Sequence, residues 1–316
     1  MSKIGLIDVD SVIPNLALMK LSAYHKSIGD QVEMAKFFER YDTIYASKVF
    51  TGSDDYDDRS YIAGVFINGG TGYDLNIRLD PGIENIYPDY SLYKMKEAMG
   101  YLTRGCHRNC PFCIVTQKEG PVARKVADVS DIWHGQKKII LLDPNILACK
   151  DRIQLLRSLS DTKAMIDFTQ GLDVRLLDEE VIDILKNTKI KYLHFAWDQM
   201  KNEDIIYRNL KLAAESQIVK NPKSIIVYVL TNYDTTKEED LYRISKLKEL
   251  GVIPYVMVYN RHLLPTGGFY KRLQSWVNGK WMFWRLDSFK EFLKFRDYKS
   301  GYTIYEYQEE FPDDKS

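Results

Sequence analysis

Residues 100–113 read GYLTRGCHRNCPFC, and three of the four cysteines of the 316-residue chain lie in this segment. Cys106, Cys110 and Cys113 follow the spacing Cys-x3-Cys-x2-Cys. Packing alone does not explain three thiols within eight positions, and thiolates are soft ligands for iron and zinc. The segment therefore predicts a loop that holds a metal centre.

Three interpretations of the loop are open at this point. Three thiolates can bind three irons of a cubane 4Fe-4S cluster and leave the fourth iron free for a substrate or cofactor. A zinc site with His107 as fourth ligand is the competing metal site, although His107 directly follows Cys106 and would strain a tetrahedron. Buried cysteines without a metal are the third. The isolated Cys149 is expected to be a small core residue.

Composition limits the classes of protein. The 44 basic and 44 acidic residues cancel, so net charge alone does not draw the chain to nucleic acid or to an anionic membrane. Hydrophobic residues make up 45% of the chain, enough for a large core in two domains or in a barrel with an appendage. With no apolar run near the length of a membrane span, we expect a cytoplasmic protein without a membrane partner.

Residues 1–92 predict a small parallel α/β domain. A strand over 3–9 precedes a helix from Leu16 to about Gly29, and buried strands are expected over 41–49 and 61–67. The glycine-rich residues 68–74 are interpreted as a tight turn at a strand end rather than as a phosphate cradle.

Residues 93–262 predict six strand–helix repeats, which suit an open partial (β/α)6 barrel with right-handed crossovers. The helices expected between the strands include one over 237–250, where Thr236 and Glu239 form a capping box. The predicted strands are 99–103, 138–142, 164–169, 190–197, 224–230 and 252–258.

Polar side chains follow these predicted strands at their carboxyl ends, where barrels of this kind bind ligands. The first strand leads directly into the cysteine loop. The later strand ends carry Asp143, Pro144, Asn145, Gln170, Asp173, Arg175, Asp198, Tyr233, Tyr259 and His262. A turn or helix-cap role is the plainer explanation for each residue alone, but their convergence on the rim that carries the cysteines favours a site.

Residues 263–316 are rich in aromatic and basic side chains. Phe289, Phe292 and Phe295 recur every three residues, like the buried face of a helix. We therefore expect a cap that packs across the open barrel rather than a surface that stacks on nucleic acid. Glu309, Glu310, Asp313 and Asp314 are expected to form a solvated tail.

The cysteine spacing after the first of six predicted strands, with Phe112 before the third cysteine, resembles the radical S-adenosylmethionine (radical SAM) superfamily. Thr103-Arg104-Gly105 before the motif, and Ile114-Val115 with Glu119-Gly120 after it, are similar to the branch that includes methylthiotransferases and cobalamin-dependent radical enzymes. Residues 1–92 resemble the cobalamin-binding-like domain that precedes the barrel in that branch. The resemblance covers about residues 1–262.

The resemblance implies a role for each of the residues above. Cys106, Cys110 and Cys113 would bind a 4Fe-4S cluster, and S-adenosylmethionine would chelate its open iron. The resemblance also places Phe112 and Tyr259 by the adenine, Asp143-Pro144-Asn145 at the methionyl amine, and Gln170, Asp173 and Arg175 at the ribose and carboxylate. Asp198, Tyr233 and His262 are catalytic candidates by position only. A flavodoxin- or ferredoxin-type protein would supply low-potential electrons.

Two departures limit this resemblance. Residues 1–92 contain no cysteine, whereas methylthiotransferases bind a second cluster there. The loop after the first strand lacks the histidine that ligates cobalamin, and His25 in the next helix is expected to be solvated or to cap the helix, so cobalamin is not favoured. Three hypotheses follow: a radical SAM enzyme acting on an unidentified substrate, a radical methyltransferase or methylthiotransferase-like enzyme acting on a nucleic-acid base, and a non-catalytic iron–sulfur or zinc module.

Overall fold

The computed structural model describes residues 1–300, with side chains described as far as Phe295. The chain divides into two compact units, one of Met1–Gln170 with Asp183–Ile190, the other of Gly171–Ile182 with Lys191–Ser316. These boundaries differ from the predicted segments 1–92, 93–262 and 263–316, which remain a proposal. The predicted acidic tail lies outside the described residues. Within that part of the chain, no helix is both long enough and apolar enough to cross a membrane.

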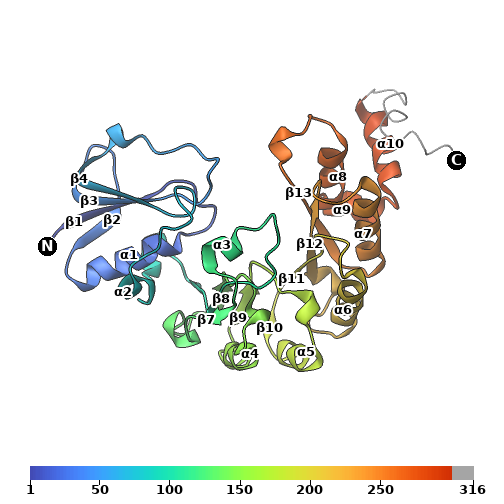
Figure 1. Cartoon of the computed structure of the whole chain (residues 1–316), viewed down its shortest axis with the longest axis horizontal. Helices are drawn as coiled ribbons and strands as arrows, with labels where there is room; N and C mark the ends of the chain where they lie inside the picture. The colour runs from blue at the N-terminus through green and yellow to red at the C-terminus, as the bar shows by residue number, and fades with distance from the viewer. Residues whose placement is uncertain (301–316) are drawn as a thin grey trace. The chain divides into compact units, whose positions relative to one another are not determined.

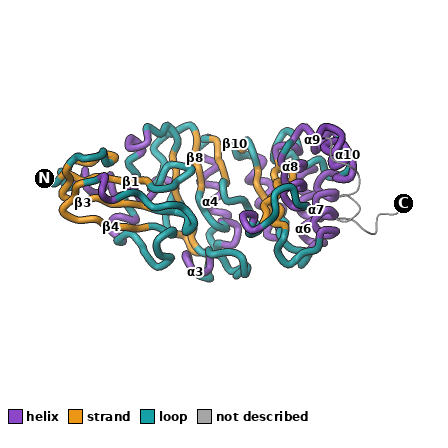
Figure 2. The backbone as a smooth tube through the Cα atoms, turned by 90° about the horizontal axis from the view of Figure 1, so that it is seen from above, coloured by secondary structure: helices purple, strands orange, loops and turns teal. Residues whose placement is uncertain are grey.

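The first unit begins with a four-stranded parallel sheet in the order β2-β1-β3-β4 (Figures 1 and 2). Helix α1 (Leu16–Ser27) begins where the Asn15 side chain accepts hydrogen bonds from the amides of residues 17 and 18. Leu18 and Leu21 of α1 pack on Ile4 and Leu6 of the sheet. The strands are β1 (Lys3–Asp8), β2 (Gln31–Met34), β3 (Arg40–Ser47) and β4 (Ile62–Gly69).

Two strands of this sheet differ from expectation. The short strand β2 was not predicted, because its polar–apolar alternation extends over only the four residues Gln31–Met34. Strand β4 was predicted to be buried, which is wrong: most of its side chains are exposed, including Val65 and Ile67. β4 is an edge strand, so it lacks a second neighbour in the sheet.

The glycine-rich residues 68–74 form a turn held to the neighbouring strand end, as expected. The amide of Gly72 donates to the carbonyl of Lys48 at 2.9 Å, and Lys48 donates its own amide to Gly69 at 3.0 Å. Gly70 has φ +98°, and a Cβ there would lie 2.3 Å from the Lys48 carbonyl oxygen. The chain then continues through α2 (Pro81–Glu84) towards the second sheet.

The second sheet of this unit is also parallel, in the order β10-β9-β8-β5. A separate antiparallel pair, β6 with β7, stands at the cysteine loop. The predicted strand 99–103 is therefore two strands, and the predicted strand 190–197 is likewise divided at residues 191–192. The strands are β5 (Ala98–Gly100), β6 (Thr103–Arg104), β7 (Arg124–Lys125), β8 (Lys138–Leu141), β9 (Met165–Phe168) and β10 (Lys189–Ile190). Helices α3 (Val115–Glu119), α4 (Arg152–Asp161) and α5 (Glu179–Lys186) lie between them in sequence.

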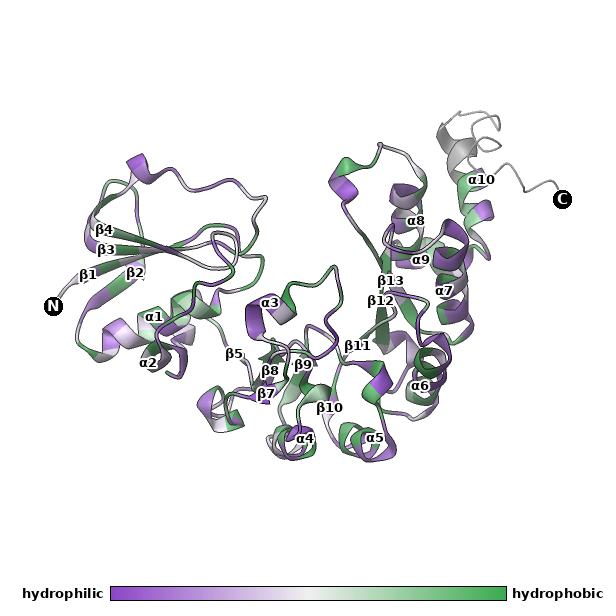
Figure 3. Cartoon of the chain, in the orientation of Figure 1, coloured by the Kyte–Doolittle hydropathy of each residue, from purple (hydrophilic) through white to green (hydrophobic). Residues whose placement is uncertain are grey.

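The second unit contains the parallel sheet β11-β12-β13, whose last two strands appear strongly hydrophobic in Figure 3. The strands are β11 (Leu193–Ala196), β12 (Ile225–Thr231) and β13 (Ile253–Val258), with helices α6 (Glu203–Glu215) and α7 (Lys237–Glu249) between them. The predicted capping box is confirmed: the amide of Thr236 donates to Glu239 at 2.8 Å and the amide of Glu239 donates to the Thr236 hydroxyl at 3.2 Å.

The aromatic C-terminal segment forms helices α8 (Phe269–Asn278), α9 (Lys280–Arg285) and α10 (Phe289–Ser300). Phe289 and Phe292 are buried, which confirms the predicted helix face, and they pack with Trp276 against Ile244 of α7 and Val256 of β13. Most of the described aromatic side chains of this segment therefore form a hydrophobic core against α7 and β13. The fold class, parallel α/β with an aromatic-rich C-terminal extension, is confirmed.

Candidate metal centre and cofactor site

The cysteine loop is closed at its base by backbone hydrogen bonds. Strands β6 and β7 pair antiparallel, with Arg104 opposite Arg124. The amide of Cys106 donates to the carbonyl of Gly120 at 3.1 Å, and that of Cys113 donates to Cys110 at 2.9 Å. Helix α3 follows the third cysteine directly. The cysteine loop therefore follows β5 and β6, and its two ends are joined by backbone hydrogen bonds.

Two left-handed residues shape the loop. Gly105 has φ +92°, and a Cβ there would lie 2.2 Å from the carbonyl oxygen of Val122, so only glycine fits between β6 and the loop. Asn109, between the first and second cysteines, has φ +46°, which asparagine tolerates better than most residues. These two positions turn the backbone around the thiols.

The three loop cysteines are in the reduced form and partly exposed, whereas Cys149 is buried as predicted. Among the described residues no group of three or more His, Cys, Asp or Glu side chains is gathered as for one metal ion. A cubane cluster is a different case, because each thiolate binds a separate iron. Three thiols on one short, accessible loop are a donor set that fits such a cluster. His107 is exposed.

Asp143, at the end of β8, holds the backbone that leads into the loop. Its buried carboxylate accepts hydrogen bonds from the Leu102 amide at 3.1 Å, from the Thr103 amide at 2.5 Å and from the Thr103 hydroxyl at 2.7 Å. Burial raises the pKa of Asp143 to about 6, although these hydrogen bonds oppose the shift. This carboxylate thus has a structural role that its sequence did not indicate, and its predicted contact with the methionyl amine stays a prediction.

Asn145, two residues further on, approaches a cysteine directly. Its buried side-chain amide donates to the Sγ atom of Cys106 at 3.5 Å. The second strand end and the cysteine loop, about forty positions apart in the chain, therefore meet here. Pro144 lies between the two residues, and Phe112 on the loop is partly buried.

Arg104 belongs to the motif before the cysteines, but its side chain was assigned no role from the sequence. Its guanidinium donates to both carboxylate oxygens of Glu119, each at 2.9 Å, and lies 3.9 Å from the centroid of the Tyr101 ring. Glu119 ends helix α3, so the pair joins the two ends of the cysteine loop. An arginine just before a metal-binding loop and a glutamate fifteen positions later were the features of the sequence that could have predicted this ion pair.

The predicted ribose and carboxylate contacts fall in both units. Gln170 is exposed and ends the first stretch of the first unit, while Asp173 and Arg175 belong to the second. Asp173 accepts hydrogen bonds from the Arg175 amide at 3.2 Å and from its Nε atom at 2.7 Å. Asp173 therefore caps the start of a short 3-10 helix (Val174–Leu176). A helix-cap role was the plainer explanation considered for such residues in the sequence.

Asp198, a catalytic candidate, lies beyond β11 in the second unit. Its carboxylate accepts a hydrogen bond from the Leu230 amide at 3.2 Å, and burial raises its pKa against the opposing charges of Arg243 and Arg175. Arg243 is fully buried, forms an ion pair with Asp240 and donates to the carbonyls of Trp197 and Leu230. The ends of β11 and β12 are thus joined by buried charged groups.

Tyr233 and Tyr259 are brought together by the second unit. Their rings meet edge to face, with centroids 4.8 Å apart. The amide of Tyr259 donates to the Thr231 carbonyl at 3.0 Å, and Asn232 donates its side-chain amide to the Tyr259 carbonyl at 2.9 Å. His262 lies nearby in sequence but is exposed. The two tyrosines therefore lie side by side after the ends of β12 and β13, and their roles in a site stay a prediction.

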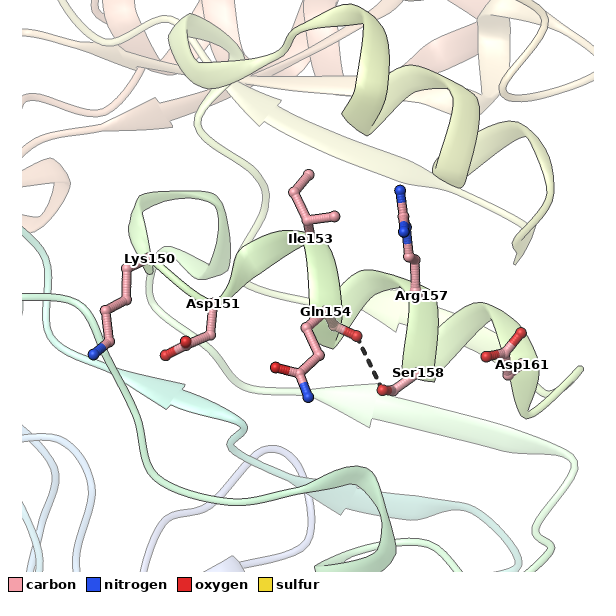
Figure 4. A pocket seen from close by; sticks show the side chains of 7 residues that line it. All are labelled: Lys150, Asp151, Ile153, Gln154, Arg157, Ser158 and Asp161. Atoms are coloured by element: carbon pink, nitrogen blue, oxygen red, sulfur yellow. Dashed lines mark hydrogen bonds between the residues drawn. The ribbon is translucent and has the colours of Figure 1, made fainter.

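A hollow on the surface of α4 carries none of the predicted site residues. Its lining comes from one helix and the residues before it, and Figure 4 shows these side chains lying along the same helix. The lining residues are Lys150, Asp151, Ile153, Gln154, Arg157, Ser158 and Asp161. The cysteine loop and not this hollow is the candidate site.

His25 in α1 is buried, so the expectation of a solvated or capping histidine is wrong. Its Nδ1 atom lies 2.8 Å from a carboxylate oxygen of Asp30, and its Nε2 atom lies 3.1 Å from the Tyr45 hydroxyl. The hydrogen bond with His25 is the main cause that lowers the pKa of Asp30. Both ring nitrogens are therefore engaged within the N-terminal sheet.

Comparison with known proteins agrees with the fold but gives little sequence identity. No family model matches the chain. A CDK5RAP1-like protein of Caenorhabditis elegans is 24% identical over 129 residues, or 39% of this chain, and the match spans about a quarter of that relative (24%).

Two solved structures of the radical S-adenosylmethionine methyltransferase TsrM from Kitasatospora setae are similar to this chain. One, with cobalamin and a 4Fe-4S cluster bound, has a TM-score of 0.61 at 11% identity over 81% of this chain and 74% of that one. The other, with tryptophan substrate and the SAM analogue aza-SAM bound, has a TM-score of 0.57 at 11% identity over 81% and 72%. The chain therefore has a fold similar to that of TsrM.

Proposed function

We propose that this chain is a radical SAM enzyme whose Cys106, Cys110 and Cys113 bind a 4Fe-4S cluster. The observation that carries the proposal is the Cys-x3-Cys-x2-Cys loop at the end of the first strand of a parallel sheet, in a fold similar to that of TsrM. When bound, the cluster and S-adenosylmethionine would supply a 5′-deoxyadenosyl radical that takes hydrogen from a substrate.

The chain's own residues would position these groups. Asp143 fixes the backbone entering the loop, and Asn145 donates a hydrogen bond to the first cysteine. Hydrogen bonds to ligand sulfurs help set the potential of an iron–sulfur cluster. Phe112, Pro144, Gln170, Asp173, Arg175 and Tyr259 are proposed cofactor contacts, and Asp198, Tyr233 and His262 are candidates for contact with substrate. A flavodoxin- or ferredoxin-type protein is the proposed electron donor.

Anaerobic reconstitution tests this function. The protein with iron and sulfide should bind about four irons, become brown and, after reduction with S-adenosylmethionine, release 5′-deoxyadenosine. The matched control is Cys149→Ser, which removes the one cysteine outside the loop. A colourless protein that binds a single zinc after the same treatment would refute the cluster and favour the alternative of a zinc module.

Cobalamin-dependent methyl transfer is a second candidate. TsrM is a methyltransferase with cobalamin bound, and residues 1–69 here form a parallel sheet whose order reverses between β1 and β3, the place where such sheets bind ligands. Both nitrogens of His25 are engaged, so a corrin would bind without this histidine as ligand. Repeating the reaction with cobalamin distinguishes the candidates: methylated product with S-adenosylhomocysteine supports methyl transfer.

The substrate is proposed to be a small molecule. TsrM was solved with tryptophan, and several of the aromatic residues first weighed as a stacking surface, such as Trp276 and Phe283, are buried in this chain, whereas Trp281 is exposed. Modification of a nucleic-acid base, the alternative, requires an exposed stacking surface. RNA or DNA binding that persists at low salt and falls with added salt would favour that alternative.

A further inference from the structure

Arg104 joins the cysteine loop to the N-terminal sheet as well as closing the loop. Its Nη2 atom donates to Oε1 of Glu84 at 2.6 Å, and Glu84 ends helix α2 in the segment that follows the sheet. Glu84 in turn pairs at 3.2 Å with Lys20 of α1, the helix packed on the sheet. Four side chains of alternating charge thus run from α1 to α3: Lys20, Glu84, Arg104 and Glu119.

The network is shielded from water along most of its length. The side chains of Lys20, Arg104 and Glu119 are 11%, 17% and 11% exposed, and Glu84 is 32% exposed. Burial lowers the pKa of Lys20, whereas Glu84 and Glu119 together overcome the effect of burial and raise that of Arg104. Shielded, hydrogen-bonded charges are screened less by salt than surface pairs, and loss of one partner leaves the others without compensation.

A second set of contacts links the same two regions. Lys118, on α3, donates from Nζ to the carbonyl of Ile77 at 3.0 Å, and Arg78 donates to the carbonyl of Lys118. Ile77 and Arg78 therefore contact α3 directly, whereas Glu84 reaches it only through Arg104. Arginine is required at position 104 because its planar guanidinium contacts two carboxylates and an aromatic ring at once, which a lysine ammonium cannot do.

We infer that Arg104 is a positioning residue that couples the N-terminal sheet to the cysteine loop through Glu84. The shape of the loop then depends on whether α1, α2 and α3 are linked, so a change in the N-terminal sheet is transmitted to the thiols. This inference rests on the proposed function only in taking the loop thiols to be cluster ligands. The contacts themselves are present in the protein without a cluster.

The test measures thiol alkylation rates in the cluster-free protein by mass spectrometry. Glu84→Gln and Arg104→Lys should each raise the alkylation rate of the three loop thiols by about threefold or more, because the loop opens locally more often. Cys149 serves as internal reference in the same sample. The matched control is Arg124→Lys, opposite Arg104 in the strand pair. The exposed Arg124 side chain donates to the backbone carbonyl of Glu119 at 2.7 Å, a contact that a lysine can also make, so this variant should keep wild-type rates.

Glu84→Gln decides the coupling, since it leaves the Arg104–Glu119 pair intact. Wild-type rates in a folded Glu84→Gln protein overturn the inference, even if Arg104→Lys is fast. If Glu84→Gln does not fold, Lys20→Gln replaces it, with the same expected increase and the same contradicting result. In parallel, the reconstituted variants should show a shifted electron paramagnetic resonance spectrum. A wild-type protein that takes up no iron would refute the proposed cluster. The alkylation rates would still test the coupling between the N-terminal sheet and the loop.

Discussion

Each unit places a buried carboxylate where a strand ends, but the two carboxylates have different surroundings. Asp143, after β8, accepts hydrogen bonds from the amides of Leu102 and Thr103 and from a hydroxyl. Asp198, after β11, accepts one from the Leu230 amide and lies near the charges of Arg243 and Arg175. A buried carboxylate therefore supports the entrance of a loop in the first unit, whereas in the second unit it links the end of β11 to β12.

The difference also shows in what the strand ends present. In the first unit the backbone held by Asp143 leads into three accessible thiols, which suits a soft metal. In the second unit the strand ends carry an aromatic pair, Tyr233 with Tyr259, beside a buried ion pair. We expect the first unit to bind metal. Changes at its cysteine loop should therefore alter iron content, whereas changes at the buried ion pair of the second unit should alter the free energy of unfolding.

The largest expected effect comes from removing a loop thiol. Cys106→Ala should abolish cluster binding and lower 5′-deoxyadenosine formation at least about 100-fold, because altering even outer partners of a metal site costs 10- to 100-fold. Iron analysis and product chromatography measure both, and Cys149→Ala should keep the iron of the wild type. Full iron content in Cys106→Ala would show that the cysteine loop of the first unit is not the metal site.

Arg243→Met should cause the largest loss of stability in the second unit. It leaves Asp240, whose pKa burial raises, without its buried partner, at a cost of about 3–5 kcal/mol in the free energy of unfolding. Without the arginine, protonation relieves the buried carboxylate, so the loss should be larger at neutral than at acidic pH. Urea denaturation measures it. Lys246→Met, which breaks the exposed pair with Glu249 on the same helix, should cost under about 1 kcal/mol; equal losses would contradict the buried pair's role.

Asp143→Asn should reduce stability by about 1–3 kcal/mol, since an asparagine presents its amide hydrogens to donors that need an acceptor. The wild type should also show a pH signature. The folded pKa is about 6 and the ordinary value 3.8, so the stabilising contribution of this group is complete below the lower value and is lost as pH rises through the upper one. Denaturation of both proteins between pH 4 and pH 7 should reveal this difference, whereas parallel pH profiles would show that Asp143 does not titrate in this range.

Thr236→Ala should have the smallest effect. It removes one half of the capping box at the start of α7 and should cost about 1 kcal/mol, without changing iron content. Thermal unfolding and iron analysis measure the two quantities. An altered iron content here would mean that the second unit's helices influence the first unit's loop.

Much of the fold was accessible from sequence because it depends on local patterns. The apolar runs that became β8, β12 and β13 and the capping box of α7 lie within single short windows. The same reasoning failed at β2, whose alternating pattern is only four residues long, and at β4, whose apolar residues are exposed at a sheet edge. Hydrophobicity indicates a strand but not which strand lacks a neighbour.

The candidate site divides in the same way. The spacing of Cys106, Cys110 and Cys113 identified the loop, because the ligands of a cluster on one loop are local in sequence. The contact of Arg104 with Glu84 and the burial of His25 against Tyr45 could not be predicted from the sequence. Each partner is twenty positions away in the chain and comes close only in the folded structure.

By itself, the sequence determined which atoms are available: three thiols on one loop, a glycine at position 105, and strand ends rich in polar groups. Only the tertiary structure decided that Asp143 holds the loop's entrance, that Asn145 meets Cys106, and that Lys20, Glu84, Arg104 and Glu119 form one network. The physical reason is that ligand spacing is a property of consecutive residues, whereas hydrogen bonds and ion pairs between distant segments exist only after burial brings them together.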